Sequence, residues 1–440
     1  MKKNCSAVIL HPARGKAAPM SQDRKTLFTS ISIAFLITGN LIGAGILALP
    51  VATGLAGFIP SLLVMIVVGG SMYFSAAILS KEAVLEKTHT FNYPSLYHKY
   101  LGTIGKWTAI LANLLILYGL LTAYLSGATS IISNLIGASI PGWAILLTFF
   151  AFMTWLSISE MRIIKKYNVL LIIMMWLSFG LIVAISGSSI EPSRLRYMDW
   201  EFAAVTVPIV ITSFHFHNII PQVCENLEWN ISRILKVMLA GMLIGYLMNA
   251  IWMMVGIGSI PLSEGENSIL AAFQANLPAT VPLSKILDSA IFVTGAAIFA
   301  LLAIATSYLA NGLALLGFFD DLVENHFKIH SRTLKVVLAF APPLAVSLFY
   351  PSIFLKTVDL VGGVGIAMLF GILPCIIAYK KFSGSRVAKI FISIILIIFT
   401  CTLGFEIMEK FGRVNVKPHI QNWSTHMHGK PISVDKLRSK

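Results

Sequence analysis

Long apolar runs alternate with short polar or basic connections along most of the chain. Eleven of these runs approach or exceed the length of about 20 residues that a helix needs to cross a bilayer. They lie at about 27–52, 55–80, 104–126, 141–158, 167–187, 203–221, 235–258, 285–314, 334–350, 358–379 and 387–405. The pattern therefore predicts an all-α polytopic membrane protein with 11 transmembrane helices, whose membrane domain is residues 27–405.

The composition excludes an ordinary soluble domain. Hydrophobic residues make up 57% of the 440 residues and charged residues only 12%, whereas about a quarter of a soluble domain is charged. The net charge of +14 comes from Lys and Arg in short clusters between the apolar runs, where such clusters orient helices against the cytoplasmic leaflet. We therefore expect the lipid bilayer as a partner and no nucleic acid.

The distribution of basic residues predicts the orientation. Residues 1–26 carry six of them but no apolar core typical of a cleaved signal, so we expect a cytoplasmic tail. With this end inside, the cytoplasmic segments hold 22 Lys and Arg and the outer loops hold 4, as the positive-inside rule requires. An odd number of helices places the basic tail 406–440 outside. Either this tail is an exception to the rule, or the number of helices differs by one.

Two of the eleven segments are interrupted at corresponding places. The first holds three glycines and an asparagine between residues 39 and 45, and the sixth holds a polar stretch at 212–218 between two prolines. Such interruptions, five helices apart, are typical of inverted five-helix repeats with a binding site at the bilayer midplane. We predict repeat one at about 27–187, repeat two at about 203–379 and an extra helix at about 387–405.

The glycine-rich break in the first segment allows two interpretations. Gly39 and Gly43 form a GxxxG pair, which is typical of close helix packing. Alternatively, the glycines permit an unwound hinge whose backbone N–H groups bind a carboxylate. We favour the hinge, with Gly43, Ala44 and Gly45 as substrate-binding residues. The partial match to a dinucleotide-binding motif is accidental, because such a motif needs a preceding strand.

Polar side chains inside the other spans are candidates for substrate or ion contact. His215 lies in the sixth segment, where an ionisable residue is a functional candidate, although a histidine beside a helix break also commonly donates to a carbonyl. Thr306 and Ser307 lie in the middle of the eighth segment. Their hydroxyls either bond to the preceding turn or, together with Asn40, ligate a coupling cation. Tyr118, Thr122 and Tyr124 in the third segment are candidates for the wall of the site by their helical spacing, although Tyr118 and Tyr124 cannot share one narrow face.

No motif indicates catalysis or a bound metal. His217 completes an HxH pair with His215, but no Cys or carboxylate cluster accompanies it. Acidic residues such as Asp359 lie near the ends of the spans, which argues against a carboxylate relay through the bilayer. The sequence has no Walker motif, nucleophile elbow or HExxH, so we expect no enzyme and no cofactor besides a coupling proton or sodium ion. The tail also holds three histidines, which we expect to be solvated: His419, His426 and His428.

With these interrupted segments, the chain resembles the bacterial aromatic amino acid permease family, the tyrosine- and tryptophan-specific transport proteins of the amino acid, polyamine and organocation superfamily. The resemblance covers nearly all of 27–405. It is carried by residues 39–50, 118–127, 212–221, 305–309 and 317–322. It implies a LeuT-type 5+5 inverted repeat with broken helices 1 and 6, and a substrate cavity between helices one, three, six, eight and ten.

The resemblance also implies roles for individual residues. The N–H groups of the hinge would bind a substrate carboxylate, and the carbonyls around Ser213 and Phe214 would bind the ammonium group. Phe214 or Phe216 would close over an aromatic side chain. The family usually has a small residue at the position of His215 and often threonine at that of Asn40. Asparagine there is similar to the sodium-coupled neutral amino acid transporters of the same superfamily.

Together these features predict a secondary active transporter of the bacterial cytoplasmic (inner) membrane, multi-pass and with a cytoplasmic N-terminus. We expect it to import an aromatic amino acid, tyrosine or tryptophan, by proton-coupled alternating access. The alternatives are a sodium-coupled symporter of neutral or aromatic amino acids, a gradient-independent exchanger or channel, and a sensor that binds without transporting. The sequence does not rank tyrosine against tryptophan or phenylalanine, and it leaves the oligomeric state unknown.

Overall fold

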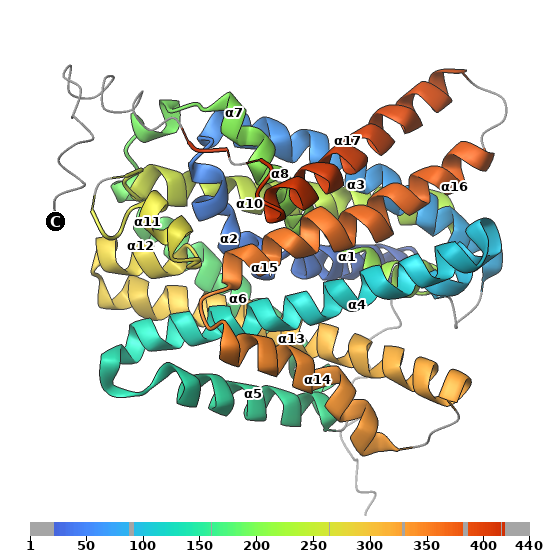
Figure 1. Cartoon of the computed structure of the whole chain (residues 1–440), viewed down its shortest axis with the longest axis horizontal. Coiled ribbons are helices and arrows are strands. Elements are labelled where there is room, and N and C mark those ends of the chain that lie inside the picture. The colour runs from blue at the N-terminus through green and yellow to red at the C-terminus, as the bar shows by residue number, and fades with distance from the viewer. Residues whose placement is uncertain are drawn as a thin grey trace, which may run out of the picture.

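The computed structural model describes residues 22–418, apart from 88–91, 160, 264, 328–330, 382–385 and 415. Helices account for all regular secondary structure in this part of the chain. In Figure 1 the long helices run roughly side by side across the view, and the short helices α11 and α12 lie together at its left edge. Most of the predicted tails 1–26 and 406–440, including the three tail histidines, lies outside the described residues.

The described part of the chain contains seventeen α-helices, five short 3-10 helices and one long π-helical segment. The π-helical segment, Val361–Ile372, joins α15 to α16. The α-helices are α1 (Gln22–Leu41), α2 (Ala44–Gly54), α3 (Phe58–Glu86), α4 (Tyr93–Ile136), α5 (Gly142–Ile158), α6 (Met161–Ser186), α7 (Trp200–Ala203), α8 (Val207–Ser213), α9 (Ile220–Asn226), α10 (Ile231–Ser259), α11 (Ile269–Gln274), α12 (Thr280–Leu287), α13 (Ala290–Phe327), α14 (Arg332–Phe349), α15 (Phe354–Leu360), α16 (Leu373–Lys381) and α17 (Arg386–Lys410).

Eight helices of the described residues are long and apolar enough to cross a membrane, and the bent pair α1–α2 adds a ninth if it counts as one span. Two shorter apolar helices, Gly142–Ile158 and Ile173–Ser189, lie at the fourth and fifth predicted segments. The all-helical membrane architecture is therefore confirmed. The apolar pattern does not predict α11 and α12, because Pro, Gly and Ser interrupt it between α10 and α13.

Local sequence explains where several helices begin. Asn92, Asn230 and Ser331 stand immediately before α4, α10 and α14, and each side chain accepts a hydrogen bond from a backbone N–H three residues later. These caps satisfy donors that the first helical turn leaves free. Within α4, Gly102 has a φ of +68° and kinks the helix. Glycine adopts this left-handed conformation without steric cost.

Small residues bring α10 close to both halves of the first segment. A β-carbon at Gly241 of α10 would lie 2.8 Å from the carbonyl oxygen of Ala34 in α1, and one at Gly256 would lie 2.2 Å from Cβ of Pro50 in α2. Such contacts are typical of membrane helices, where van der Waals packing drives association. α10 thereby holds α1 and α2 on either side of their break.

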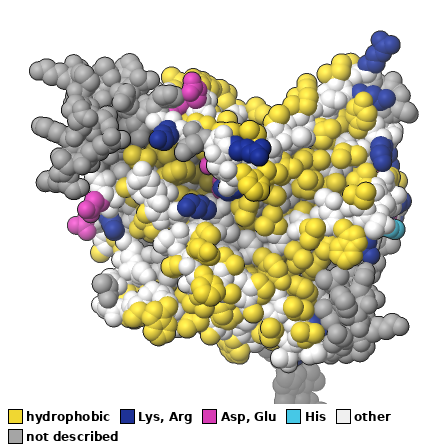
Figure 2. Space-filling model, in the orientation of Figure 1, with side chains coloured by type: hydrophobic (Ala, Val, Ile, Leu, Met, Phe, Trp, Pro, Cys, Tyr) yellow, Lys and Arg dark blue, Asp and Glu magenta, His cyan; other side chains and the backbone are white. Residues whose placement is uncertain are grey.

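The last helix differs from the prediction at its C-terminal end. α17 continues to Lys410, five residues beyond the predicted end, so Glu406 belongs to a helix and not to the tail. Ile390, Ile394 and Ile397 of α17 are more than half exposed, and hydrophobic side chains cover much of the face seen in Figure 2, as lipid contact requires. Glu406, in contrast, is fully buried. Packing of this polar last turn against other helices extends α17 beyond the apolar run that the sequence displays.

Candidate functional site

The first segment is broken between α1 and α2, as predicted. α1 ends at Leu41, α2 begins at Ala44, and the two helices are bent by 53°. Gly43 at the break has φ −148° and ψ −142°, and no side chain caps the start of α2. The first N–H groups of α2 therefore lack helical partners and lie at the positive end of its dipole. Such a helix end favours an anion.

The sixth segment is also broken. α8 ends at Ser213, and α9 begins at Ile220 after a three-residue turn of 3-10 helix. The two broken segments contact each other directly, because a β-carbon at Gly45 would lie 2.7 Å from Cα of Ser213. This close approach requires glycine at position 45. Backbone groups freed by both breaks therefore lie near one another.

A cavity lies at these breaks and contains seven of the eleven predicted site residues. Those seven are Asn40, Gly43, Ala44, Gly45, His215, Thr306 and Ser307. The other residues of its wall are Leu36, Gly39, Leu41, Leu120, Tyr124, Met175, Thr212, Ala310 and Asn311. None of these lining residues is Lys, Arg, Asp or Glu. A charged ligand in the cavity must therefore be bound by backbone dipoles and neutral polar groups.

Tyr118 lies elsewhere than predicted. Its hydroxyl donates to the backbone carbonyl of Leu338 in α14 at 2.7 Å, outside the cavity. Tyr124, six residues further along α4, lines the cavity instead. Six residues turn a helix by about 600°, which leaves the two side chains about 120° apart. For this reason only one of the two tyrosines faces the cavity.

Three predicted residues of the sixth segment, Ser213, Phe214 and Phe216, also lie outside the cavity lining. The hydroxyl of Ser213 donates to the carbonyl of Ile209 one turn earlier at 2.9 Å. The ring of Phe214 lies 6.4 Å from that of Tyr246 in α10, measured between centroids, and Phe216 is fully buried. These side chains pack around the break and do not form the wall of the cavity.

Asn311 is a lining residue that the sequence analysis missed. Its Nδ2 atom donates to the carbonyl of Ser307 at 2.8 Å and to the hydroxyl of Tyr124 at 3.3 Å. It follows Ser307 by one helical turn in α13, so the i to i+4 spacing was the available signal that both share a face. Met175 and Thr212 were missed as well. The context of Met175 carries no comparable signal, whereas Thr212 begins the polar stretch 212–218 of the sixth segment.

Two buried polar atoms of residues that line the cavity have no hydrogen-bond partner among the described residues. They are Nε2 of His215 and Oδ1 of Asn311. A buried polar atom left unpaired costs about 1–3 kcal/mol, so a ligand that bonds to these atoms gains binding energy. His217 differs, because it lies outside the cavity lining and its Nε2 is 3.2 Å from the carbonyl oxygen of Met72.

Oxygen atoms that can contact a small cation gather beside the first break. The hydroxyl of Ser307 is 3.5 Å from the carbonyl oxygen of Ile42, and Asn40 lines the same cavity. Thr306 donates to the carbonyl of Leu302 at 2.8 Å, which is the helix-internal bond expected of such a residue. A hydroxyl that donates still keeps acceptor lone pairs. The arrangement therefore accommodates helix packing and ion contact together.

Comparison with known proteins relates this geometry to a family. Residues 26–409 match the tryptophan/tyrosine permease family. The chain is similar to the tyrosine-specific transport system 1 of Haemophilus influenzae, with 26% identity over 80% of this chain and 88% of that protein. It is also similar to the tryptophan-specific transport protein of the same organism, with 25% identity over 78% of this chain and 86% of that protein.

A solved structure shares the fold. A mutant of the manganese transporter of Eremococcus coleocola superimposes with a TM-score of 0.60, over 96% of this chain and 92% of that one. The two sequences are only 13% identical. The likeness therefore concerns the arrangement of helices alone.

Proposed function

Because the chain belongs to the tryptophan/tyrosine permease family, we propose that it is a secondary active transporter that imports an aromatic amino acid across the bacterial cytoplasmic membrane. The family consists of permeases, so the chain is not an enzyme. Tyrosine and tryptophan are the proposed substrates, since the two Haemophilus relatives are tyrosine- and tryptophan-specific transport proteins.

The observation that carries this proposal is the cavity without charged side chains at the two helix breaks. A free amino acid brings one carboxylate and one ammonium group, and the lining offers no countercharge to either. In our proposal the N–H groups of Gly43, Ala44 and Gly45 bind the carboxylate at the positive end of α2. Carbonyl groups at the end of α1 and around Ser213 and Phe214 bind the ammonium.

The side chain of the substrate extends, in this proposal, toward His215 and Asn311. Their unpartnered Nε2 and Oδ1 atoms bond to the phenolic hydroxyl of tyrosine or the indole N–H of tryptophan. Phenylalanine has no polar group to satisfy them. It is therefore expected to bind more weakly than either.

Alternating access by a LeuT-type five-plus-five inverted repeat is the proposed mechanism. Two features support it: the breaks lie within the first and sixth predicted segments, and the eight long apolar helices of the described residues, together with the bent pair α1–α2, lie at predicted segments. In transporters of this kind one helix bundle rocks against another around a fixed site. We propose a cytoplasmic N-terminus on the distribution of Lys and Arg.

An inward proton gradient is the proposed energy source, and a sodium gradient is the second candidate. The resemblance to aromatic amino acid permeases favours the proton. Sodium is favoured by one observation, the position of Asn40, Thr306 and Ser307 in the cavity wall, with the carbonyl of Ile42 beside Ser307. Hard cations bind to oxygen ligands of these kinds.

Uptake of labelled tyrosine and tryptophan into proteoliposomes tests the proposal. The liposomes carry an inward pH gradient, an inward sodium gradient or no gradient. We expect accumulation above the external concentration only with the pH gradient. Uptake that merely equilibrates under every condition would identify an exchanger or channel, and binding without uptake would identify a sensor. Accumulation driven by sodium alone would replace the proton as coupling ion.

A further inference from the structure

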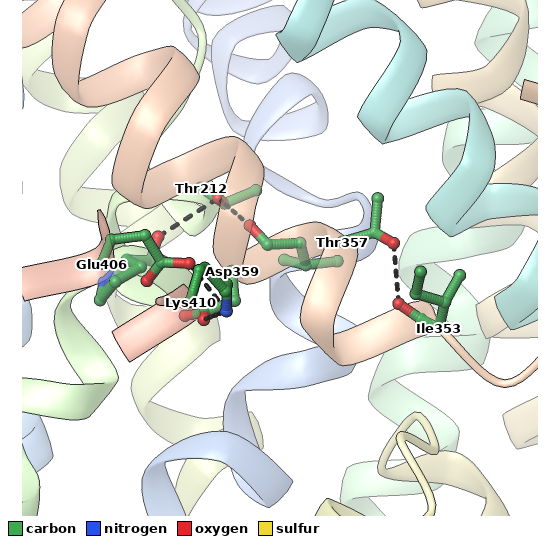
Figure 3. A network of polar contacts seen from close by, with 8 residues as sticks. Thr212, Ile353, Thr357, Asp359, Glu406 and Lys410 are labelled. Atoms are coloured by element: carbon green, nitrogen blue, oxygen red, sulfur yellow. Dashed lines mark hydrogen bonds and ion pairs between the residues drawn. The ribbon is translucent and has the colours of Figure 1, made fainter. Parts of the chain in front are cut away.

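A group of charged side chains lies between α15 and α17, apart from the cavity lining. Nζ of Lys410 is 3.1 Å from Oδ2 of Asp359 and 2.9 Å from Oε1 of Glu406. Glu409 joins them, and one oxygen from each of the three carboxylates lies within 4.8 Å of the others. Figure 3 shows Asp359, Glu406 and Lys410 converging from the two helices. We call these four residues the carboxylate cluster.

We propose that the carboxylate cluster is a proton-binding site whose three carboxylates share one proton, and that Thr212 links it to the substrate cavity. The role of the cluster in transport rests on the proton coupling proposed above. The existence of the proton-binding site does not depend on that proposed coupling. The two can therefore be tested separately.

The charges of the carboxylate cluster do not balance when every group is ionised. Three carboxylates and one ammonium leave a net charge of −2. Carboxylates this close to one another, and removed from water, favour the protonated form of at least one of them. A proton shared within such a group belongs to the group as a whole and not to one residue.

Glu406 is the most deeply buried of the residues that pair with Lys410. Its side chain is 0% exposed, whereas that of Asp359 is 14% exposed and that of Lys410 is 37% exposed. Its Oε2 atom has no hydrogen-bond partner among the described residues. A β-carbon at Gly363 would lie 2.8 Å from Cγ of Glu406, so this side chain rests on the π-helical segment. A proton held by the carboxylate cluster lowers the negative charge beside this buried side chain, and its O–H can donate to a neighbouring carboxylate.

The chemistry of the carboxylate cluster fits a proton better than a metal ion. The ammonium of Lys410 already contacts both Asp359 and Glu406, and it repels a second cation. The charged groups that act on Asp359 are Glu406, Glu409 and Lys410, while α8, which packs against α15, contributes the neutral hydroxyl of Thr212.

Thr212 joins the carboxylate cluster to the cavity. It lines the cavity, and its hydroxyl donates at 2.9 Å to the carbonyl of Val358, the residue before Asp359. Figure 3 shows this contact beside the ion pairs. A β-carbon at Gly362 would lie 2.5 Å from Oγ1 of Thr212, so α8 touches the π-helical segment directly. A movement of α8 on substrate binding therefore shifts Asp359 relative to α17, and the linkage acts equally in the reverse direction.

Infrared difference spectroscopy of the reconstituted protein tests the site itself. We expect the wild type at neutral pH to show a protonated carboxyl band of the carboxylate cluster that titrates away in alkali. The band should be missing in Glu406→Gln, because this substitution removes one of the negative charges that hold the shared proton. Glu82→Gln is the matched control, because Glu82 is a buried carboxylate that pairs with Lys381 at 2.5 Å outside the carboxylate cluster. This control should keep the band. Asp359→Asn is a second variant, in which the band should titrate at a different pH.

Transport by the same variants tests the link to the cavity. Under an inward pH gradient we expect tyrosine accumulation in Glu406→Gln to fall about tenfold below that in Glu82→Gln. A tenfold effect lies within the usual range of coupling between two sites. A band that is missing from the wild type, or that persists in Glu406→Gln, overturns the proposal whatever the uptake shows. Displacement of the band by sodium also overturns it, in favour of a cation site. A band that titrates as expected in a protein whose uptake ignores the pH gradient supports the proton site and refutes the proposed proton coupling.

Discussion

Replacing Gly45 with alanine tests how closely the two broken segments pack. The added β-carbon would lie 2.7 Å from Cα and 2.8 Å from the backbone nitrogen of Ser213, and backbone atoms cannot rotate away. Overpacking of this kind costs about 1–3 kcal/mol. Gly39→Ala is the matched control, because no atom lies within 4 Å of a β-carbon there. Alanine gains about 0.5–1 kcal/mol over glycine in a helix, and this gain cancels when the two variants are compared.

Unfolding by denaturant in detergent micelles measures the difference. We expect the free energy of unfolding of Gly45→Ala to lie about 1–3 kcal/mol below that of Gly39→Ala. Uptake by Gly45→Ala should also be lower, because separating α2 from α8 deforms the cavity. Gly43→Ala should be intermediate, since its β-carbon meets the hydroxyl of Ser307 at 3.0 Å and a hydroxyl can rotate. Equal stability of Gly45→Ala and Gly39→Ala would refute the direct contact between the broken segments.

Three further substitutions probe the cavity and its surroundings. His215→Leu should weaken the inhibition of uptake by tyrosine and tryptophan about fivefold relative to inhibition by phenylalanine, since a hydrogen bond contributes about 1 kcal/mol. An unchanged order of inhibition would contradict a role of His215 in substrate contact. Thr306→Ala should leave pH-driven uptake intact, and loss of a sodium-driven component would instead assign Thr306 to an ion site. Tyr118→Phe removes a hydrogen bond outside the cavity, so it should lower the free energy of unfolding by about 1 kcal/mol. It should change the KM for uptake less than twofold. A large rise in KM would place Tyr118 at the substrate.

The positions of the helices and of their breaks follow from the amino-acid sequence. Inside a bilayer each backbone group needs a partner within its own segment or a protein-lined cavity. A span must therefore be long and apolar, and its interruptions must contain residues such as Gly and Pro, whose effect on a helix is local. The breaks at residues 42–43 and after Ser213 lie within the interruptions that the sequence displays. The seven predicted residues that line the cavity could be recognised for the same reason. Five of them lie at or near those breaks, and the other two, Thr306 and Ser307, are polar residues within an apolar helix.

The faces of those helices were decided by tertiary structure. Tyr118 and Tyr124 have the same chemistry and lie on one helix, yet α14 accepts the hydroxyl of Tyr118 while Tyr124 faces the cavity. Asp359 lies near the end of a span by sequence, and Glu406 falls beyond the last apolar run. They form one cluster, with Glu406 fully buried, only because α17 packs against the π-helical segment. The rotation of a helix about its axis, and the loss of water around a charged side chain, depend on neighbours that are distant in the chain, so no local pattern of residues determines them.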